Sequence, residues 1–112
     1  MGWFGGMMVQ TNHRVPGDYE TITVGAEAVG LSVAKVQPVS GLYAGLSAQA
    51  ALLSLEGGDV RIRLDGGLPT AENGHILVGG DALSLTGTQS LYQFRAIRAG
   101  ELNGVLRVTY FY

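Results

Sequence analysis

The stretch AQAALLSLEGGDVRIRLD, residues 48–65, decides the fold class that the sequence predicts. In its second half, DVRIRLD (residues 59–65), polar and apolar side chains alternate without a break, as in a half-buried β-strand. An apolar run at residues 48–56 precedes it, and the Gly57-Gly58 dipeptide between them suits the positive φ angles of a tight turn. The sequence therefore predicts an antiparallel β-hairpin over residues 48–65.

The register of this hairpin is consistent with its apolar faces. A two-residue loop would join apolar residues in three cross-strand pairs: Leu55 with Val60, Leu53 with Ile62 and Ala51 with Leu64. The same register turns Leu52 outward and sets Glu56 against Asp59, a like-charge pair. In an alternative interpretation, Ser47 caps an Ala-rich helix that ends at Gly57. The agreement between turn and register favours the strands.

Working outward from the hairpin, further β-rich runs are separated by glycines. The predicted strands are residues 19–24, 29–36, 75–78, 82–86, 91–98 and 105–112. Gly79-Gly80 predicts a second hairpin, between residues 75–78 and 82–86. Residues 37–47, with room for a short turn of helix, and residues 65–74 contain proline and glycine and are expected to be loops.

These elements predict an all-β fold. We expect a single antiparallel β-sandwich or small barrel of about seven to eight strands. The predicted organisation is an N-terminal arm at residues 1–17, followed by one β-sandwich domain at residues 18–112.

The composition points to a poorly charged surface. Charged residues make up 14% of the 112, where about 25% is usual, and the net charge is -2. With seven basic residues, nine acidic ones and no basic run, we expect no nucleic-acid partner. Cysteine is absent, which excludes disulfides and thiolate metal sites, and no apolar run approaches the length of a membrane span. Either neutral polar groups or other chains must cover the remaining surface.

Motifs of catalysis are weak. The chain has no G-x-G fingerprint, and Lys35, its only lysine, does not follow a glycine as in a P-loop. Ser32 and Lys35 match S-x-x-K, but neither S-D-N nor K-T-G accompanies them. A triad of Ser84, His75 and Asp81 would form only if the second hairpin closed, and no residues that would build an oxyanion hole accompany it. A hydrogen bond from His75 to the 65–74 loop is the simpler expectation, and we predict that the protein is not an enzyme.

Metal ligands are equally sparse. Four oxygen-bearing side chains would surround a Ca²⁺ ion if the 65–74 loop folded over the second hairpin: Asp65, Glu72, Asn73 and Asp81. Their order does not follow the EF-hand spacing, and His13 and His75 have no second ligand at metal-binding spacing. We therefore expect no metal and no cofactor.

The two apolar ends of the chain carry a stronger signal. Residues 1–9 are rich in Trp, Phe and Met, with glycines too flexible for a stable strand, and aromatic residues run to the last position. Apolar side chains outside a core are suited to docking on other chains, although the C-terminal strand also fits a place in the core. The predicted interface residues are Trp3, Phe4, Met7, Met8, Leu52, Tyr110, Phe111 and Tyr112.

The second half of the chain resembles a known kind of protein. From Ala48 onward, a little over half of the chain, the order of features is similar to that of small virion proteins of tailed bacteriophages. The stretches that carry the resemblance are VRIRLDGGLPTAENGHILVGGDALSLTG (residues 60–87) and LYQFRAIRAGELNGVLRVTYFY (residues 91–112), with the pattern V-R-x-R-L-D-G, P-T, G-H, G-D, F-R-A-I and V-T-Y-F. The resemblance implies a virion component, such as a capsid decoration (cement) protein or a head or tail accessory.

A shorter resemblance concerns one loop. The D-G-x-x-P-T piece at residues 65–70 is similar to a loop of small β-sandwich modules appended to glycoside hydrolases, in which it is a structural turn. This chain departs from those modules, because Ile62 and Arg63 stand where aromatic residues are usual.

Pattern and resemblance together predict an assembly protein of the virion, made in the host cytoplasm. We expect the major capsid protein or other virion proteins as partners, and no membrane partner. We also expect a closed homo-oligomer, with a trimer on capsid three-fold positions favoured and the arm contributing to contacts. The alternative is a receptor- or carbohydrate-binding β-sandwich on a phage tail structure, with Trp3, Tyr43 and Tyr92 as candidate sugar platforms.

Overall fold

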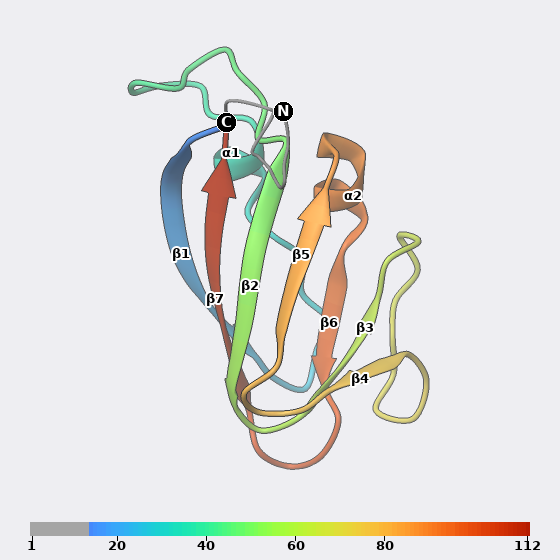
Figure 1. Ribbon diagram of the computed structural model, residues 1–112. Coiled ribbons are helices and arrows are strands. Elements are labelled where there is room, and N and C mark those ends of the chain that lie inside the picture. The colour runs from blue at the N-terminus through green and yellow to red at the C-terminus, as the bar shows by residue number, and fades with distance from the viewer. Residues whose placement is uncertain (1–13) are drawn as a thin grey trace, which may run out of the picture.

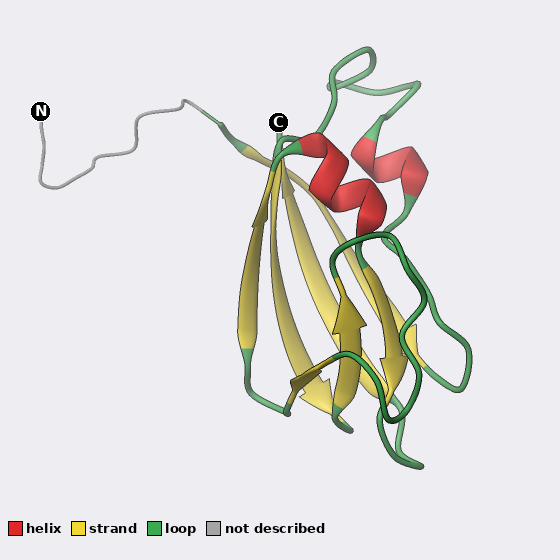
Figure 2. Ribbon diagram, turned by 90° about the vertical axis from the view of Figure 1, so that its right-hand side faces the viewer, coloured by secondary structure: helices red, strands yellow, loops and turns green. Residues whose placement is uncertain are grey.

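Two antiparallel sheets face each other in the structure, a computed structural model that describes residues 14–112 (Figure 1). The strands are β1 (Pro16–Val24), β2 (Ala50–Gly57), β3 (Val60–Arg63), β4 (His75–Leu77), β5 (Ala82–Thr86), β6 (Arg95–Arg98) and β7 (Gly104–Phe111). A four-stranded sheet has the order β1-β7-β2-β5, and a three-stranded sheet has the order β4-β3-β6. Helices α1 (Val33–Val36) and α2 (Thr88–Gln93) lie at one end of the sandwich (Figure 2). We call this the apical end and the opposite one the basal end.

The core lies between the sheets and follows the alternation of the strands. From β2 come Ala51, Leu53 and Leu55, from β3 Val60 and Ile62, and from β7 Leu106, Val108 and Tyr110, all of them buried. The prediction of an all-β fold is confirmed, and the sheets are not closed into a barrel. No helix among residues 14–112 is long and apolar enough to span a bilayer.

The hairpin predicted over residues 48–65 is wrong in its pairing, although both strands exist. β2 pairs with β5 and β7, whereas β3 pairs with β4 and β6 in the other sheet. The alternation buries Val60 and Ile62 whether two strands lie side by side or face each other, whereas Leu64, predicted to pair with Ala51, lies past the end of β3 and is 42% exposed. Crossing between the sheets also avoids the like-charge pair, because Glu56 bonds to Arg107 and the Asp59 carboxylate accepts from the Gly79 N–H.

The second predicted hairpin is wrong for the same reason, because β4 and β5 belong to different sheets. The connection from β6 to β7 also crosses between the sheets, so three crossings meet at the basal end. Backbone hydrogen bonds tie them together, among them Gly58 N–H to Asn103 O at 3.0 Å and Gly80 N–H to Leu55 O at 2.8 Å. The approach is close: a Cβ at Gly58 would lie 2.3 Å from the Leu102 carbonyl oxygen.

Two predicted strands contain helix. In residues 29–36 only Val29 forms a β-bridge, to Ala96, and the chain then turns into α1. Residues 91–98 divide into the end of α2 and strand β6. Leu91 and Phe94 are both buried, and their spacing of three suits a helical turn better than one face of a strand.

The four-stranded sheet begins within the segment predicted as an arm. β1 starts at Pro16, and the residue before it, Val15, exchanges two backbone hydrogen bonds with Tyr112, at 3.2 and 3.0 Å. The rest of the predicted arm, residues 1–13, lies outside the described residues.

Candidate binding surface

The two most exposed large apolar side chains of the described structure, Val39 and Leu42, lie on one loop. The apical loop, residues 37–49 between α1 and β2, projects beyond the end of the sandwich (teal to green at the top of Figure 1). Val39 is 90% exposed, Leu42 is 87% exposed and Leu46 is 53% exposed. Burial of such side chains is favourable, so an apolar group held in water at the tip of a loop is typical of a contact surface.

The apical loop is held by its own hydrogen bonds and by an aromatic stack. Gly45 N–H donates to Pro38 O at 3.2 Å, and Leu46 N–H donates to Tyr43 O at 3.0 Å. The ring of Tyr43 stacks on that of Tyr112, with centroids 4.7 Å apart and planes 14° apart. These contacts fix the base of the loop and leave its apolar tips free of the domain.

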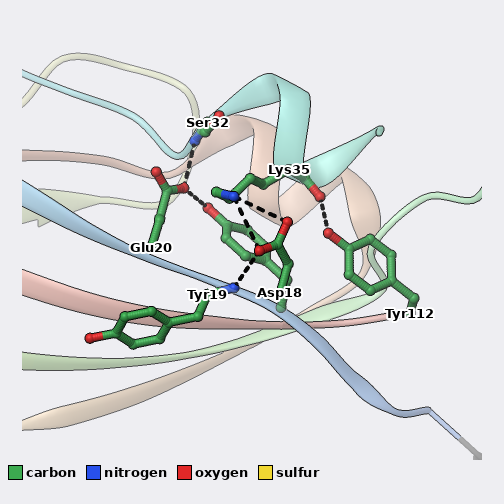
Figure 3. A network of polar contacts seen from close by, with 7 residues as sticks. Asp18, Tyr19, Glu20, Ser32, Lys35 and Tyr112 are labelled. Atoms are coloured by element: carbon green, nitrogen blue, oxygen red, sulfur yellow. Dashed lines mark hydrogen bonds and ion pairs between the residues drawn. The ribbon is translucent and has the colours of Figure 1, made fainter. Parts of the chain in front are cut away.

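A polar network anchors the helix from which this loop departs (Figure 3). Lys35 Nζ lies 3.1 Å from both carboxylate oxygens of Asp18, which joins α1 to β1. The Glu20 carboxylate accepts from the Ser32 N–H at 3.2 Å and from the Tyr110 hydroxyl. The Tyr112 hydroxyl donates to the Lys35 carbonyl oxygen. These contacts join the first and last strands to α1.

The protonation of this network suits a structural role. The pKa of Asp18 is lowered, first by the hydrogen bond from the Tyr19 N–H and then by Lys35. Burial, followed by the hydrogen bond to Glu20, raises the pKa of Tyr110, and burial also raises the pKa of Tyr112. Both phenols are therefore neutral donors at physiological pH, and Asp18 is a fully charged acceptor.

The predicted interface residues fall in different places. Trp3, Phe4, Met7 and Met8 lie outside the described residues. Leu52 is 45% exposed on the outer face of β2, where its register placed it, and Phe111 and Tyr112 are half-buried at the apical end. Tyr110 is 0% exposed in the core of its own domain, so its side chain has no surface to offer a partner.

The outer face of the four-stranded sheet is almost free of charge. Its outward positions carry Tyr19, Thr21, Thr23, Ala50, Leu52, Ser54, Glu56, Ala82, Ser84, Thr86, Val105, Arg107, Thr109 and Phe111. The two charged side chains, Arg107 and Glu56, pair with each other at 3.1 Å. The low overall charge of the chain is thus most evident on this face.

The three-stranded sheet contrasts with it, because three arginines lie on its outer side. Arg61 donates to the carbonyl oxygens of Ala71 and Gly74 in the 65–74 loop, at 3.4 and 3.1 Å. Arg63 pairs with Asp65 at 2.6 Å and lowers the pKa of that carboxyl to about 2. Arg95 donates to the carbonyl oxygens of Tyr92 and Phe94, at 2.7 Å each. The guanidinium groups of all three arginines therefore form hydrogen bonds that stabilise loops and turns of their own chain.

The candidate catalytic residues are not brought together as a triad. His75 lies in the three-stranded sheet, whereas Ser84 lies in the four-stranded sheet and Asp81 directly precedes its strand. The Asp81 carboxylate accepts from the Val78 N–H at 2.9 Å, and no hydrogen bond joins the His75 side chain to the 65–74 loop within the described chain. In the S-x-x-K match, Lys35 is bound to Asp18.

The suggested calcium ligands are likewise dispersed. Asp65 forms a salt bridge with Arg63, and the Asp81 carboxylate accepts a hydrogen bond in the turn before β5. From Arg14 to Tyr112, no three His, Asp or Glu side chains lie close enough together to hold a metal ion. An open hollow of about 640 Å³ beside the 65–74 loop is lined by Arg63, Asp65, Asn73 and His75, and its strongest charges are the paired Arg63 and Asp65.

The aromatic residues suggested for sugar binding do not form one platform in the described region. Tyr43 is stacked on Tyr112, and the Tyr92 hydroxyl donates to the Gln37 side chain at 2.7 Å. The third candidate, Trp3, lies outside the described residues. Sequence reasoning did not single out Tyr19, which is half-exposed beside Arg107, although its alternation with Thr21 and Thr23 was visible.

No protein-family model, curated protein or solved structure matches this chain.

The apical loop itself was missed as a binding surface by sequence reasoning. Its proline and glycines predicted a loop but not which side chains it would expose. The available signal was the occurrence of Val39, Leu42 and Leu46 in a segment without strand alternation.

Proposed function

We propose that this protein is a non-enzymatic structural component of a tailed-bacteriophage virion, and specifically a decoration or cement protein that binds the major capsid lattice. The proposal is supported by the sequence resemblance over residues 60–112 and by the apolar surface at the apical end. A decoration protein works by presenting a rigid surface many times over to a repeated lattice.

The observation that carries the proposal is the exposure of Val39 and Leu42 on a loop that is itself ordered. A loop fixed in advance loses little conformational entropy when it binds, so more of the free energy of apolar burial is available for affinity. Here the Tyr43–Tyr112 stack and the bond from Gly45 to Pro38 provide that order. An apolar tip on a fixed base is suited to insertion between the subunits of a larger assembly.

The same surface suits self-association. We propose that copies meet through their apical loops in a closed homo-oligomer, with a trimer favoured. In a cyclic arrangement the loops of neighbouring copies pack side by side around the symmetry axis, and the ends of their apolar tips still face the lattice. A net charge of -2 on 112 residues opposes such an approach only weakly.

The test of the virion assignment is the protein content of phage particles purified from the culture that produces this chain. We expect the chain in the particles, in a fixed ratio to the major capsid protein. We also expect a variant carrying Val39→Asp and Leu42→Asp to be lost from them. A matched control is Leu102→Asp, because Leu102 is 72% exposed at the basal end. Purified particles that lack the wild-type chain would exclude the assignment.

A further inference from the structure

A shallow apolar groove crosses the outer face of the four-stranded sheet near its apical end. Its volume is about 340 Å³, at the small end of ligand-binding sites in proteins. Ala50, Leu52, Ser84, Thr86 and Phe111 line it, and Arg14 forms part of its wall. Because Leu52 is 45% exposed there, an occupant of apolar character would bury surface that water now covers.

The chain contains a segment whose chemistry matches this groove. Residues 1–13 carry no Asp, Glu, Lys or Arg, and five large apolar side chains fall within the first eight positions: Met1, Trp3, Phe4, Met7 and Met8. Methionine and aromatic side chains adapt well to irregular apolar surfaces. The glycines at positions 5 and 6 would allow the backbone to approach the sheet closely.

Arg14 connects the segment to the groove. It is the residue directly after the segment and it already lines the groove, so the segment ends at the site. The Nε atom of Arg14 is buried and donates to no acceptor within residues 14–112. Buried donors of this kind normally have a partner, and a carbonyl oxygen of an extended segment lying in the groove would supply one.

We propose that residues 1–9 bind in this groove on the outer face of their own chain. Seven residues of extended chain, from Met7 to Arg14, span about 23 Å. Neighbouring strands are only about 4.8 Å apart, so this reach covers the distance from Arg14 to β5 with slack for a turn. A tether of this length gives an effective concentration in the millimolar range, which favours the chain's own groove over that of another copy. The proposal does not depend on the virion assignment.

The absence of cysteine from the chain allows a direct test with the full-length protein. Met7→Cys combined with Ser84→Cys places one thiol on the segment and one on the exposed side of β5. Under mild oxidation at micromolar concentration, we expect a disulfide within one chain, seen as loss of both thiols at the mass of a single chain. Met7→Cys with Leu102→Cys is the control, because Leu102 lies at the basal end, and its thiols should stay reduced.

Two results would overturn the proposal. Disulfides only between chains would assign the segment to a second copy, and free thiols at positions 7 and 84 would show that the segment does not occupy the groove. Trp3 gives an independent readout, because it is the only tryptophan of the chain. We expect blue-shifted emission from Trp3 in the wild type, a red shift in Leu52→Arg and no change in Leu102→Arg. Emission typical of a fully exposed indole in the wild type would contradict the proposal.

Discussion

The two ends of this sandwich are built on opposite principles. At the basal end three crossings between the sheets press backbone against backbone, and glycines allow the approach. At the apical end, side-chain contacts hold the structure. Polar contacts of Asp18, Lys35 and Glu20 and a stack of two tyrosines support a loop whose apolar tips lie in solvent. The basal end therefore serves the stability of the fold, whereas the apical end exposes apolar side chains that are available for contacts with other chains.

The largest effect on stability should come from the basal end. Gly58→Ala introduces a Cβ that would meet the Leu102 carbonyl oxygen at 2.3 Å, so one crossing must move. We expect a loss of about 2–3 kcal/mol in the free energy of unfolding, measured by urea denaturation. Gly100→Ala is the control, because nothing lies within 4 Å of its Cβ, and it should change stability by less than about 0.5 kcal/mol. Equal effects of the two substitutions would refute the close packing of the crossings.

An intermediate effect is expected from the buried part of the apical network. Tyr110→Phe removes the hydroxyl that donates to Glu20, and the cost should be about 1–2 kcal/mol of unfolding free energy. Tyr19→Phe is the comparison, because it removes a hydroxyl from a half-exposed tyrosine on the outer face of β1, where water can replace its partners. If Tyr19→Phe destabilised the protein more than Tyr110→Phe, the assignment of the network as the anchor of α1 would be wrong.

A smaller effect should be visible as a pH dependence. The pKa of Asp18 is lowered in the folded state, so its contribution is present above the unfolded value of about 4 and is lost as the pH falls through the lowered pKa. The melting temperature of Asp18→Asn should therefore fall less than that of the wild type between about pH 5 and pH 2. Parallel curves for the two proteins would show that Asp18 carries no such contribution.

The alternation of residues 59–65 predicted β3 and its buried residues Val60 and Ile62, because burial on one side leaves a period of two, but it also predicted a buried Leu64, which is exposed past the end of β3. It could not predict their pairing, since a hairpin and a crossing between two sheets bury the same residues. Helix α2 was not predicted, because Leu91 and Phe94 span a single helical turn, which is too short to show a helical period in the sequence. Of the candidate surface, only the outward position of Leu52 followed from the sequence, through the alternation along its strand. The exposure of Val39 and Leu42 depends on a loop conformation that no local pattern encodes.

The smallest effect on stability is expected at the tip of the apical loop. Val39→Asp with Leu42→Asp changes two side chains that the domain itself leaves exposed, so the free energy of unfolding of the monomer, measured at a concentration too low for assembly, should shift by less than about 0.5 kcal/mol per site. Urea denaturation checks this directly. A large loss of stability would mean that the tips of the loop pack against the domain.

The central claim is that the apical loop is a contact surface between chains, and light scattering of the full-length protein tests it most directly. The account predicts that the wild type has three times the 11.7 kDa mass of one chain and that Val39→Asp with Leu42→Asp reduces it to a single chain. Leu102→Asp, the control at the basal end with a side chain that is 72% exposed, should keep the wild-type mass. A wild type that is monomeric at every concentration, or an oligomer that the apical double variant leaves intact, would contradict the claim.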